Sequence, residues 1–255
     1  MLAAERKQLI NELIQEKKSV SVAELSERFG VTGETIRRDL KALEREGSLT
    51  RTYGGAFVQS GVENLINAEL RKTLYVEEKE IIADRCRALI DNGDALFLDN
   101  STTCFFLARA IQDMHLTIVT NNLPIMNLLA KNESIRLVSI GGEFSIPEQS
   151  FYGSVAMKLL REYYVDKSFV SCRTLSIENG VTESTDQWAF IRQLMLERSN
   201  EHYLAADHTK FDRTSFVRIT GYDDISAIIT DRPLRAEWHE LTNKYGCRII
   251  DAPTS

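Results

Sequence analysis

The stretch SVAELSERFGVTGETIRRDLKALEREGSLTRTYGGA, residues 21–56, decides the fold of the first part of the chain. It predicts two short helices joined by a tight turn, because Ser21 can cap the first helix and Gly30 suits its left-handed end. Thr32 can cap the second helix. An amphipathic helix over residues 3–17 precedes them, and three helices in this order indicate a helix-turn-helix.

A β-hairpin wing is predicted directly after these helices. Residues 48–58, SLTRTYGGAFV, place strand-favouring residues on both sides of Gly54 and Gly55. A winged helix-turn-helix typically inserts one helix into the DNA major groove. The alternative function for such a module is contact with another protein.

The helix after Thr32 has two faces of opposite character. At 100° per residue, Ile36, Leu40 and Leu43 share one side, which predicts the core face, and cations gather on the other. Residues near the start of this helix are expected to contact the edges of the DNA bases. The later cations of the helix and the residues of the wing are expected to contact the phosphates. The alternative is a merely solvated charged face. The expected DNA-binding residues are Thr32, Glu34, Thr35, Arg37, Arg38, Lys41, Arg45, Arg51 and Tyr53.

The charge of the chain is unevenly divided. The 255 residues carry a net charge of −6, which by itself argues against a nucleic-acid partner. Residues 1–58 hold 10 Lys and Arg against 9 Asp and Glu, a net +1, whereas the remaining 197 hold 21 against 28, a net −7. The acidity therefore belongs to the second part, and the first part remains compatible with DNA.

Several classes of protein are excluded by composition. The 13 Gly and 4 Pro rule out collagen-like and low-complexity chains. Apolar runs are far shorter than the ~18–20 residues that span a bilayer, so no membrane partner is expected. The four cysteines lack C-x-x-C spacing and the four histidines are dispersed, so neither a disulfide framework nor a metal site is expected. We expect a cytoplasmic protein.

The second part alternates short apolar strands with helices. Examples are ALFLD followed by the helix CFFLARAI, and LTIVT followed by LPIMNLLA. This alternation predicts an α/β domain with a mostly parallel sheet covered on both faces. The segment RTLSIENGVTESTD is expected to be a polar loop. The expected domains are a winged helix-turn-helix over 1–58, a linker over 59–75 and an α/β domain over 76–255.

Polar loops follow several of these predicted strands. Ligands bind at the carboxyl ends of parallel strands, where Asp99-Asn100-Ser101-Thr102-Thr103 precedes a helix. Hydroxyl groups beside the free N–H groups of a helix start are the elements of an anion or phosphate site. The alternative is that Ser101 or Thr102 only caps the helix.

The chain resembles the DeoR family of bacterial regulators. TIRRDL and GGA are similar to its winged helix, with Tyr53 where a His is common. DNSTT, TNN, IGGEF, YGSVA, NGVTES and ADHTKF occur in the order of its sensor domain. That sensor domain is similar to ribose-5-phosphate isomerase, glucosamine-6-phosphate deaminase and CoA-transferase subunits, and the resemblance implies that it binds a phosphorylated sugar.

The same resemblance implies the effector site. Asn100 to Thr103 would hold the phosphate, and the other loops would line the pocket. One departure is Arg173, where many relatives have a small residue; it would either clamp a second anion or pair with Glu183. The expected effector-binding residues are Asp99, Asn100, Ser101, Thr102, Thr103, Asn121, Gly141, Gly142, Glu143, Arg173, Thr182, Glu183 and Lys210.

These features predict a DNA-binding transcriptional regulator, a repressor of a carbohydrate operon whose operator affinity changes with a phosphorylated sugar. One module contacts few base pairs, so a homodimer or homotetramer is expected. The alternative is a sugar-phosphate isomerase or deaminase with an accessory DNA-binding end. No acid–base dyad is evident in the sequence, so no enzyme activity, catalytic residue or cofactor is expected.

Overall fold

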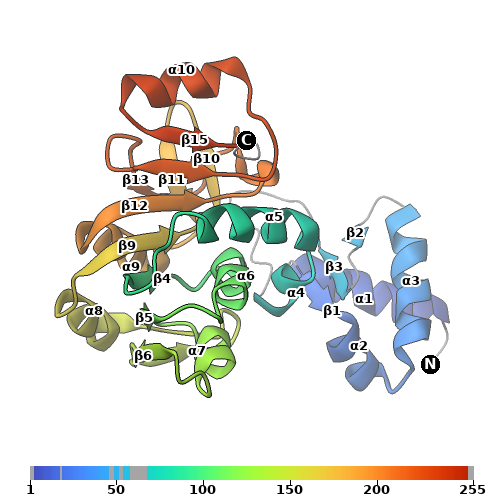
Figure 1. Ribbon diagram of the computed structural model, residues 1–255. Coiled ribbons are helices and arrows are strands. Elements are labelled where there is room, and N and C mark those ends of the chain that lie inside the picture. The colour runs from blue at the N-terminus through green and yellow to red at the C-terminus, as the bar shows by residue number, and fades with distance from the viewer. Residues whose placement is uncertain (1–2, 18, 46–48, 52–53, 58–67, 252–255) are drawn as a thin grey trace. The chain divides into compact units, whose positions relative to one another are not determined.

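The protein is described here as a computed structural model. It describes residues 3–17, 19–45, 49–51, 54–57 and 68–251. The chain divides into two compact units, Met1–Leu74 and Tyr75–Ser255, which are considered separately (Figure 1). Among the described residues, no helix is both long enough and apolar enough to cross a bilayer.

The first unit has the predicted three helices and a small sheet. Ser21 accepts a hydrogen bond from the Glu24 amide at 3.1 Å, and Gly30 ends the helix at φ 62°. On the first helix Ile10, Leu13 and Ile14 are buried, whereas Leu9 is 37% exposed. The elements are α1 Ala3–Lys17, β1 Ser19–Ser21, α2 Val22–Phe29, α3 Gly33–Arg45, β2 Thr50–Arg51, β3 Gly55–Phe57 and α4 Ala68–Lys72.

The wing is part of a three-stranded antiparallel sheet, ordered β1-β3-β2. β1 was not predicted, because three residues between two helices carry no periodic signal. Gly55 in β3 is required by its surroundings, since an added Cβ would lie 2.1 Å from the carbonyl oxygen of Val20. β1 therefore contacts the wing at a point where only glycine fits.

The predicted linker over 59–75 needs a correction at its C-terminal part. Residues 68–72 form α4, in which Ala68 and Leu70 are buried. A Cβ on Gly55 would lie 3.1 Å from Leu70 Cδ1, so α4 packs on the wing sheet. A five-residue helix is too short to show a helical period in its sequence, so the pattern did not reveal it.

The second unit is built on a seven-stranded parallel sheet, ordered β15-β14-β12-β9-β4-β5-β6. The elements that form and connect it are α5 Val76–Arg87, β4 Ala95–Leu98, α6 Thr102–Ala110, β5 Leu116–Thr120, α7 Leu123–Leu129, β6 Ile135–Ser139, α8 Gly153–Arg161, β9 Val165–Val170, α9 Asp186–Glu197, β12 Ser199–Ala205, β14 Ala227–Ile229, α10 Ala236–Lys244 and β15 Arg248–Ile250. This confirms the predicted α/β fold.

Helices cover both faces of the sheet (Figure 1), and each face has its own apolar core. In β4, Leu96 and Leu98 belong to the core that contains residues of α5, α6 and α7. Phe97 faces the other way, into the core that contains residues of α8, α9 and α10. This alternation is the two-residue period of a strand buried on both faces.

Two smaller sheets lie outside the seven-stranded sheet, and one of them includes a segment that was expected to be a loop. RTLSIENGVTESTD contains β10 and β11, which pair with each other, and β11 also pairs with β13. Strands of three or four residues between turns are too short to distinguish from a loop by their sequence pattern. These strands are β7 Glu143–Ser145 and β8 Ser150–Tyr152 in one hairpin, and β10 Thr174–Ser176, β11 Gly180–Glu183 and β13 Val217–Thr220 in the other sheet.

Candidate DNA interface and effector site

Helix α3 has the predicted division between core and surface. Ile36, Leu40 and Leu43 are buried, with at most 4% of each side chain exposed. Thr32 caps the helix, accepting from the Thr35 amide at 3.3 Å. Of the polar residues on this helix that were expected to face DNA, Thr35 is half-buried, and the others are exposed: Glu34, Arg37, Arg38, Lys41 and Arg45. An exposed cationic face on a helix held by two others is the geometry that major-groove docking requires.

Arg51 connects the wing to this helix. Its Nε donates to Glu44 Oε2 at 2.9 Å, its amide donates to Glu44 Oε1 at 2.9 Å, and its Nη1 reaches the Arg37 carbonyl at 3.3 Å. The amide hydrogen bond is the main reason that the pKa of Glu44 lies below its ordinary value. Arg51, expected as a DNA contact, thus holds β2 against α3. Tyr53 lies outside the described residues.

A buried ion pair inside this unit was missed by the sequence analysis. Arg6 Nε on α1 lies 2.7 Å from Asp39 Oδ2 on α3, and both side chains are at most 7% exposed. Asp39 lies within the cationic TIRRDL segment, where nothing in the sequence distinguishes a buried acid from a solvated one. The pair joins α1 to α3 inside the first unit.

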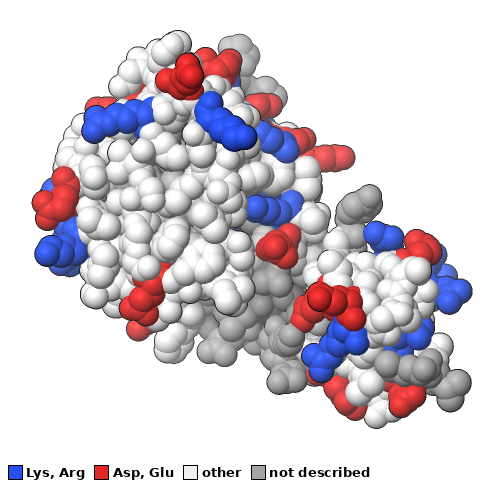
Figure 2. Space-filling view, turned by 90° about the horizontal axis from the view of Figure 1, so that it is seen from below, with Lys and Arg blue, Asp and Glu red and all other residues white. Residues whose placement is uncertain are grey.

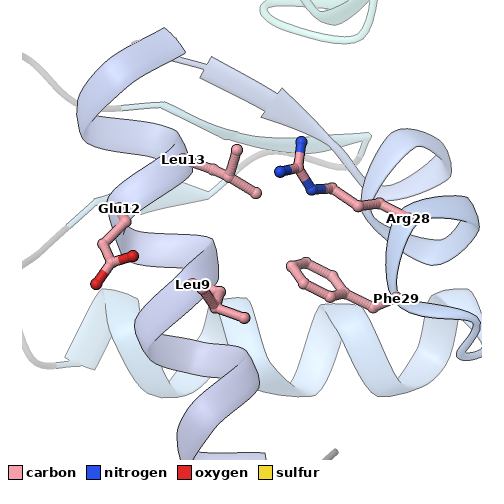
Figure 3. Close-up of a pocket in the computed structure, with 5 residues that line it drawn as sticks. All are labelled: Leu9, Glu12, Leu13, Arg28 and Phe29. Carbon is pink, nitrogen blue, oxygen red and sulfur yellow. The ribbon is translucent and has the colours of Figure 1, made fainter.

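Acidic and basic side chains are interspersed on the first unit in the view of Figure 2. No extended surface of one sign is visible on that face. The first unit also has a small hollow between α1 and α2, lined by Leu9, Glu12, Leu13, Arg28 and Phe29 (Figure 3). Its mixed lining contains none of the residues predicted for either site.

In the second unit, the predicted effector loops lie at one edge of the sheet. Because all seven strands are parallel, their carboxyl ends share this edge. Ser101 accepts from the Cys104 amide at 3.0 Å and so caps α6, as the sequence left open. Thr102 and Thr103 follow in the first turn, where backbone N–H groups have no partner within a helix.

Beneath this loop lies a buried arginine that the sequence analysis did not identify. Arg192 on α9 donates from Nε to Asp99 Oδ2 at 2.7 Å, from Nη1 to Glu183 Oε2 at 2.6 Å and from Nη2 to Asn100 Oδ1 at 3.0 Å. Its side chain is 6% exposed. In the sequence QWAFIRQLMLE, Arg192 stands among apolar residues. Its acidic partners lie far away along the chain or in another element, so the sequence alone favours a solvent-exposed arginine.

Arg192 helps to keep the Asp99 carboxyl group ionised. Burial alone would raise the pKa of Asp99, but Arg192 and the hydrogen bonds from Ser101 and Ser171 keep it below its ordinary value. Asp99 is therefore an ionised anchor that orders its own loop, accepting from the Ser101 and Ser171 amides at 2.9 Å each. Glu183 likewise pairs with Arg192, which places Asp99 and Glu183 in a supporting layer.

Lys210 brings a cation to the same edge. Its Nζ donates to Ser171 Oγ at 2.8 Å and to the Cys172 carbonyl at 2.7 Å. Asn121, after β5, donates from Nδ2 to the Phe151 carbonyl at 2.7 Å, while its buried Oδ1 has no hydrogen-bond partner among the described residues. Hydrogen bonds thus connect the ends of β12, β9 and β4.

The remaining predicted residues differ in their roles. The Thr182 hydroxyl bonds within the small sheet, to the carbonyl of Thr174 and from the amide of Ser215. Glu143 is exposed and Arg173 is half-buried beside Thr182, to which its amide donates. Gly142 has φ 147°, and an added Cβ there would lie 2.5 Å from the Tyr152 carbonyl oxygen. Gly141 precedes it in the same turn.

A winged helix-turn-helix joined to an α/β domain with a polar strand-end site defines a ligand-responsive DNA-binding protein. Residues 6–61 match the DeoR-like helix-turn-helix domain, and residues 75–232 match the DeoR C terminal sensor domain. The chain belongs to the DeoR family and is a DNA-binding transcriptional regulator.

Three relatives align over most of the chain. The HTH-type transcriptional regulator YulB of Bacillus subtilis is 38% identical over 92% of this chain and 91% of its own. The L-fucose operon activator of Haemophilus influenzae is 30% identical over 90% and 92%. The lactose phosphotransferase system repressor of Staphylococcus epidermidis is 33% identical over 87% and 89%.

Among solved structures, ribose 5-phosphate isomerase A of Methanocaldococcus jannaschii aligns with a TM-score of 0.38 and 16% identity, over 52% of this chain and 53% of that one. No role of any residue is carried over from it.

Proposed function

We propose that this chain represses a carbohydrate operon by binding operator DNA through α3 and the wing, and that a phosphorylated sugar changes this affinity. The names of the aligned relatives support a sugar operon, and they include both a repressor and an activator. Repression is the simpler assignment, since it needs only occupancy of the operator. The protein acts in the cytoplasm as a homodimer or homotetramer, because one module contacts few base pairs.

The observation that carries the effector proposal is the convergence of three groups at one sheet edge. These are the start of α6 at Thr102 and Thr103, the Lys210 ammonium, and the unpartnered Asn121 Oδ1. The first two suit a phosphate, and the third suits a sugar hydroxyl, which can donate to it. Asp99 and Glu183 are held in ion pairs, the opposite of a general base tuned toward neutral pH, so we propose binding without catalysis.

The DNA proposal predicts distinct effects of two exposed cations on α3. Arg38→Ala should cost roughly 1–3 kcal/mol on the specific operator and relax base preference, because Arg38 lies near the helix start. Lys41→Ala should weaken specific and random DNA alike and flatten the salt slope by about 1, because it contacts phosphate. Fluorescence anisotropy across a salt series measures both effects. Wild-type binding by both variants contradicts the groove assignment.

The effector proposal predicts that a phosphorylated sugar binds and its free counterpart does not. Each charge-assisted hydrogen bond to the phosphate is worth roughly 1.5–3 kcal/mol. A free sugar loses several of these bonds at once, so it should bind at least about a hundredfold more weakly. Calorimetry of the full chain with matched phosphorylated and free sugars measures this ratio. Equal affinity within every pair removes the phosphate site from the proposal, and multiple turnovers of a sugar phosphate contradict a regulator without catalysis.

A further inference from the structure

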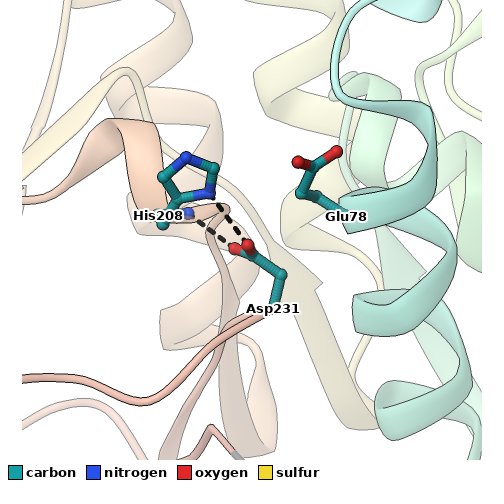
Figure 4. A group of neighbouring side chains, drawn as sticks. All are labelled: Glu78, His208 and Asp231. Carbon is teal, nitrogen blue, oxygen red and sulfur yellow. Dashed lines mark hydrogen bonds and ion pairs between the residues drawn. The ribbon is translucent and has the colours of Figure 1, made fainter.

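The second unit brings Glu78, His208 and Asp231 together, although Glu78 lies more than a hundred residues before the other two in the sequence. Each offers one ligand atom, and these atoms all lie within 4.8 Å of one another. Glu78 comes from the first turn of α5, whereas His208 and Asp231 follow the neighbouring parallel strands β12 and β14 (Figure 4). We propose that this group, here named the α5 cluster, binds a divalent transition metal of the zinc class.

The ligand set favours this class of metal. One imidazole and two carboxylates suit zinc and its neighbours, whereas calcium and magnesium prefer oxygen ligands alone. His208 Nδ1 lies 2.8 Å from Asp231 Oδ2, a contact in which a metal can replace the shared proton. Three protein ligands leave open positions for water.

The surroundings of the cluster are partly built for such an ion. Asp231 is 2% exposed and is held in place by the His208 amide, which donates to its Oδ1 at 2.7 Å. His208 and Glu78 are 27% and 24% exposed, so the site is shielded yet open to an entering ion. The ring of Tyr75 contacts His208 edge-on, with the ring centroids 5.9 Å apart.

A single guanidinium serves as counter-ion in the metal-free arrangement. Arg232 Nε lies 3.0 Å from Asp231 Oδ2, and its Nη2 lies 3.6 Å from Glu78 Oε1. Its side chain is 54% exposed, which lets it leave toward solvent when a metal arrives. The guanidinium therefore competes with the metal for the same carboxylates, and this competition can be measured.

The site would connect the loop after β12 with helix α5. His208 lies two residues before Lys210 in the loop after β12, and Glu78 lies in the first turn of α5, close to where the second unit begins. A metal held by both would clamp this loop to α5. The binding itself does not depend on the effector proposal.

Zinc titration of the full, untagged chain by calorimetry tests the proposal. We expect one zinc ion per chain, and affinity at least about tenfold weaker in Glu78→Gln and His208→Gln, since even outer-shell partners of metal ligands have effects of that size. These two positions, each about a quarter exposed, are varied instead of Asp231 because the Asp231 carboxylate also accepts a hydrogen bond from the His208 backbone amide. Circular dichroism and the melting temperature of each variant confirm folding.

His239→Gln is the matched control. His239 Nε2 forms a similar pair with Asp251 Oδ2 at 3.1 Å, with no third candidate ligand among the residues that the structure describes, so its loss should leave zinc affinity unchanged. Arg232→Ala should tighten zinc binding about tenfold, because a competing positive charge is removed. Absence of zinc binding in the wild type, unchanged affinity in Glu78→Gln and His208→Gln, equal weakening in His239→Gln, or weaker binding in Arg232→Ala would each overturn the site.

Discussion

At the scale of single residues, Arg192 holds the effector edge together. It is the shared partner of Asp99 and Asn100, which follow β4, and of Glu183, the last residue of β11. A buried pair that loses one partner leaves an uncompensated charge, and the cost is typically about 3–5 kcal/mol. Arg192 therefore orders the loop after β4, whereas the groups proposed to touch the effector are others, such as Lys210 and the start of α6.

Replacement of Arg192 with Met should destabilise the protein by about 3–5 kcal/mol at neutral pH, measured by urea unfolding. The wild-type pKa of Asp99 is lowered, so this carboxylate stabilises the fold above its ordinary pKa and loses that effect as pH falls through its folded value. Without Arg192, burial raises this pKa, so the deficit should shrink as pH falls from about 7 to about 5.

The control for this prediction is Arg109→Met. Arg109 pairs with Glu80 between α6 and α5, but both side chains are close to half exposed. Exposed pairs contribute about 0–1 kcal/mol, so this variant should stay near wild type with little dependence on pH. A pH-independent deficit in Arg192→Met would contradict the charge argument.

At the scale of elements, long periodic segments were predictable and short strands were not. The α1 helix and the α2–α3 pair follow from caps and apolar spacing, and the caps at Ser21 and Thr32 are confirmed. β1 and β10 have three residues each, and each becomes a strand only by pairing with another segment of the chain. No pattern within the three residues predicts that pairing. The strand ends that carry the candidate site were predictable; the α9 arginine beneath them was not.

The wing gives a prediction at this scale. Gly55→Ala should destabilise the first unit by at least about 1–3 kcal/mol, because its Cβ would lie 2.1 Å from the Val20 carbonyl oxygen and force β1 from β3. Thermal unfolding and operator affinity should both decline. In Gly33→Ala the new Cβ meets Val22 Cγ1 at 3.3 Å, a milder contact, so stability should change by less than about 1 kcal/mol. Equal effects would show that β1 does not constrain the wing.

At the scale of the whole molecule, the two units divide the tasks of reading DNA and sensing a metabolite. Thr102→Asp places a carboxylate at the proposed phosphate position, so it should abolish the response to the effector while operator affinity without effector stays at the wild-type value. Fluorescence anisotropy with and without the sugar phosphate measures both. Asn127→Asp adds the same charge at an exposed position on α7 and should leave the response intact.

All four cysteines lie in the second unit, and each is buried. Burial raises the pKa of all four thiols, to about 12 for Cys172 and Cys247, so the reactive thiolate is scarce in the folded protein. A thiol-modifying reagent can then act only while this unit is open. The rate of thiol modification therefore reports how often the second unit opens. The first unit contains no cysteine, so its opening does not contribute to that rate.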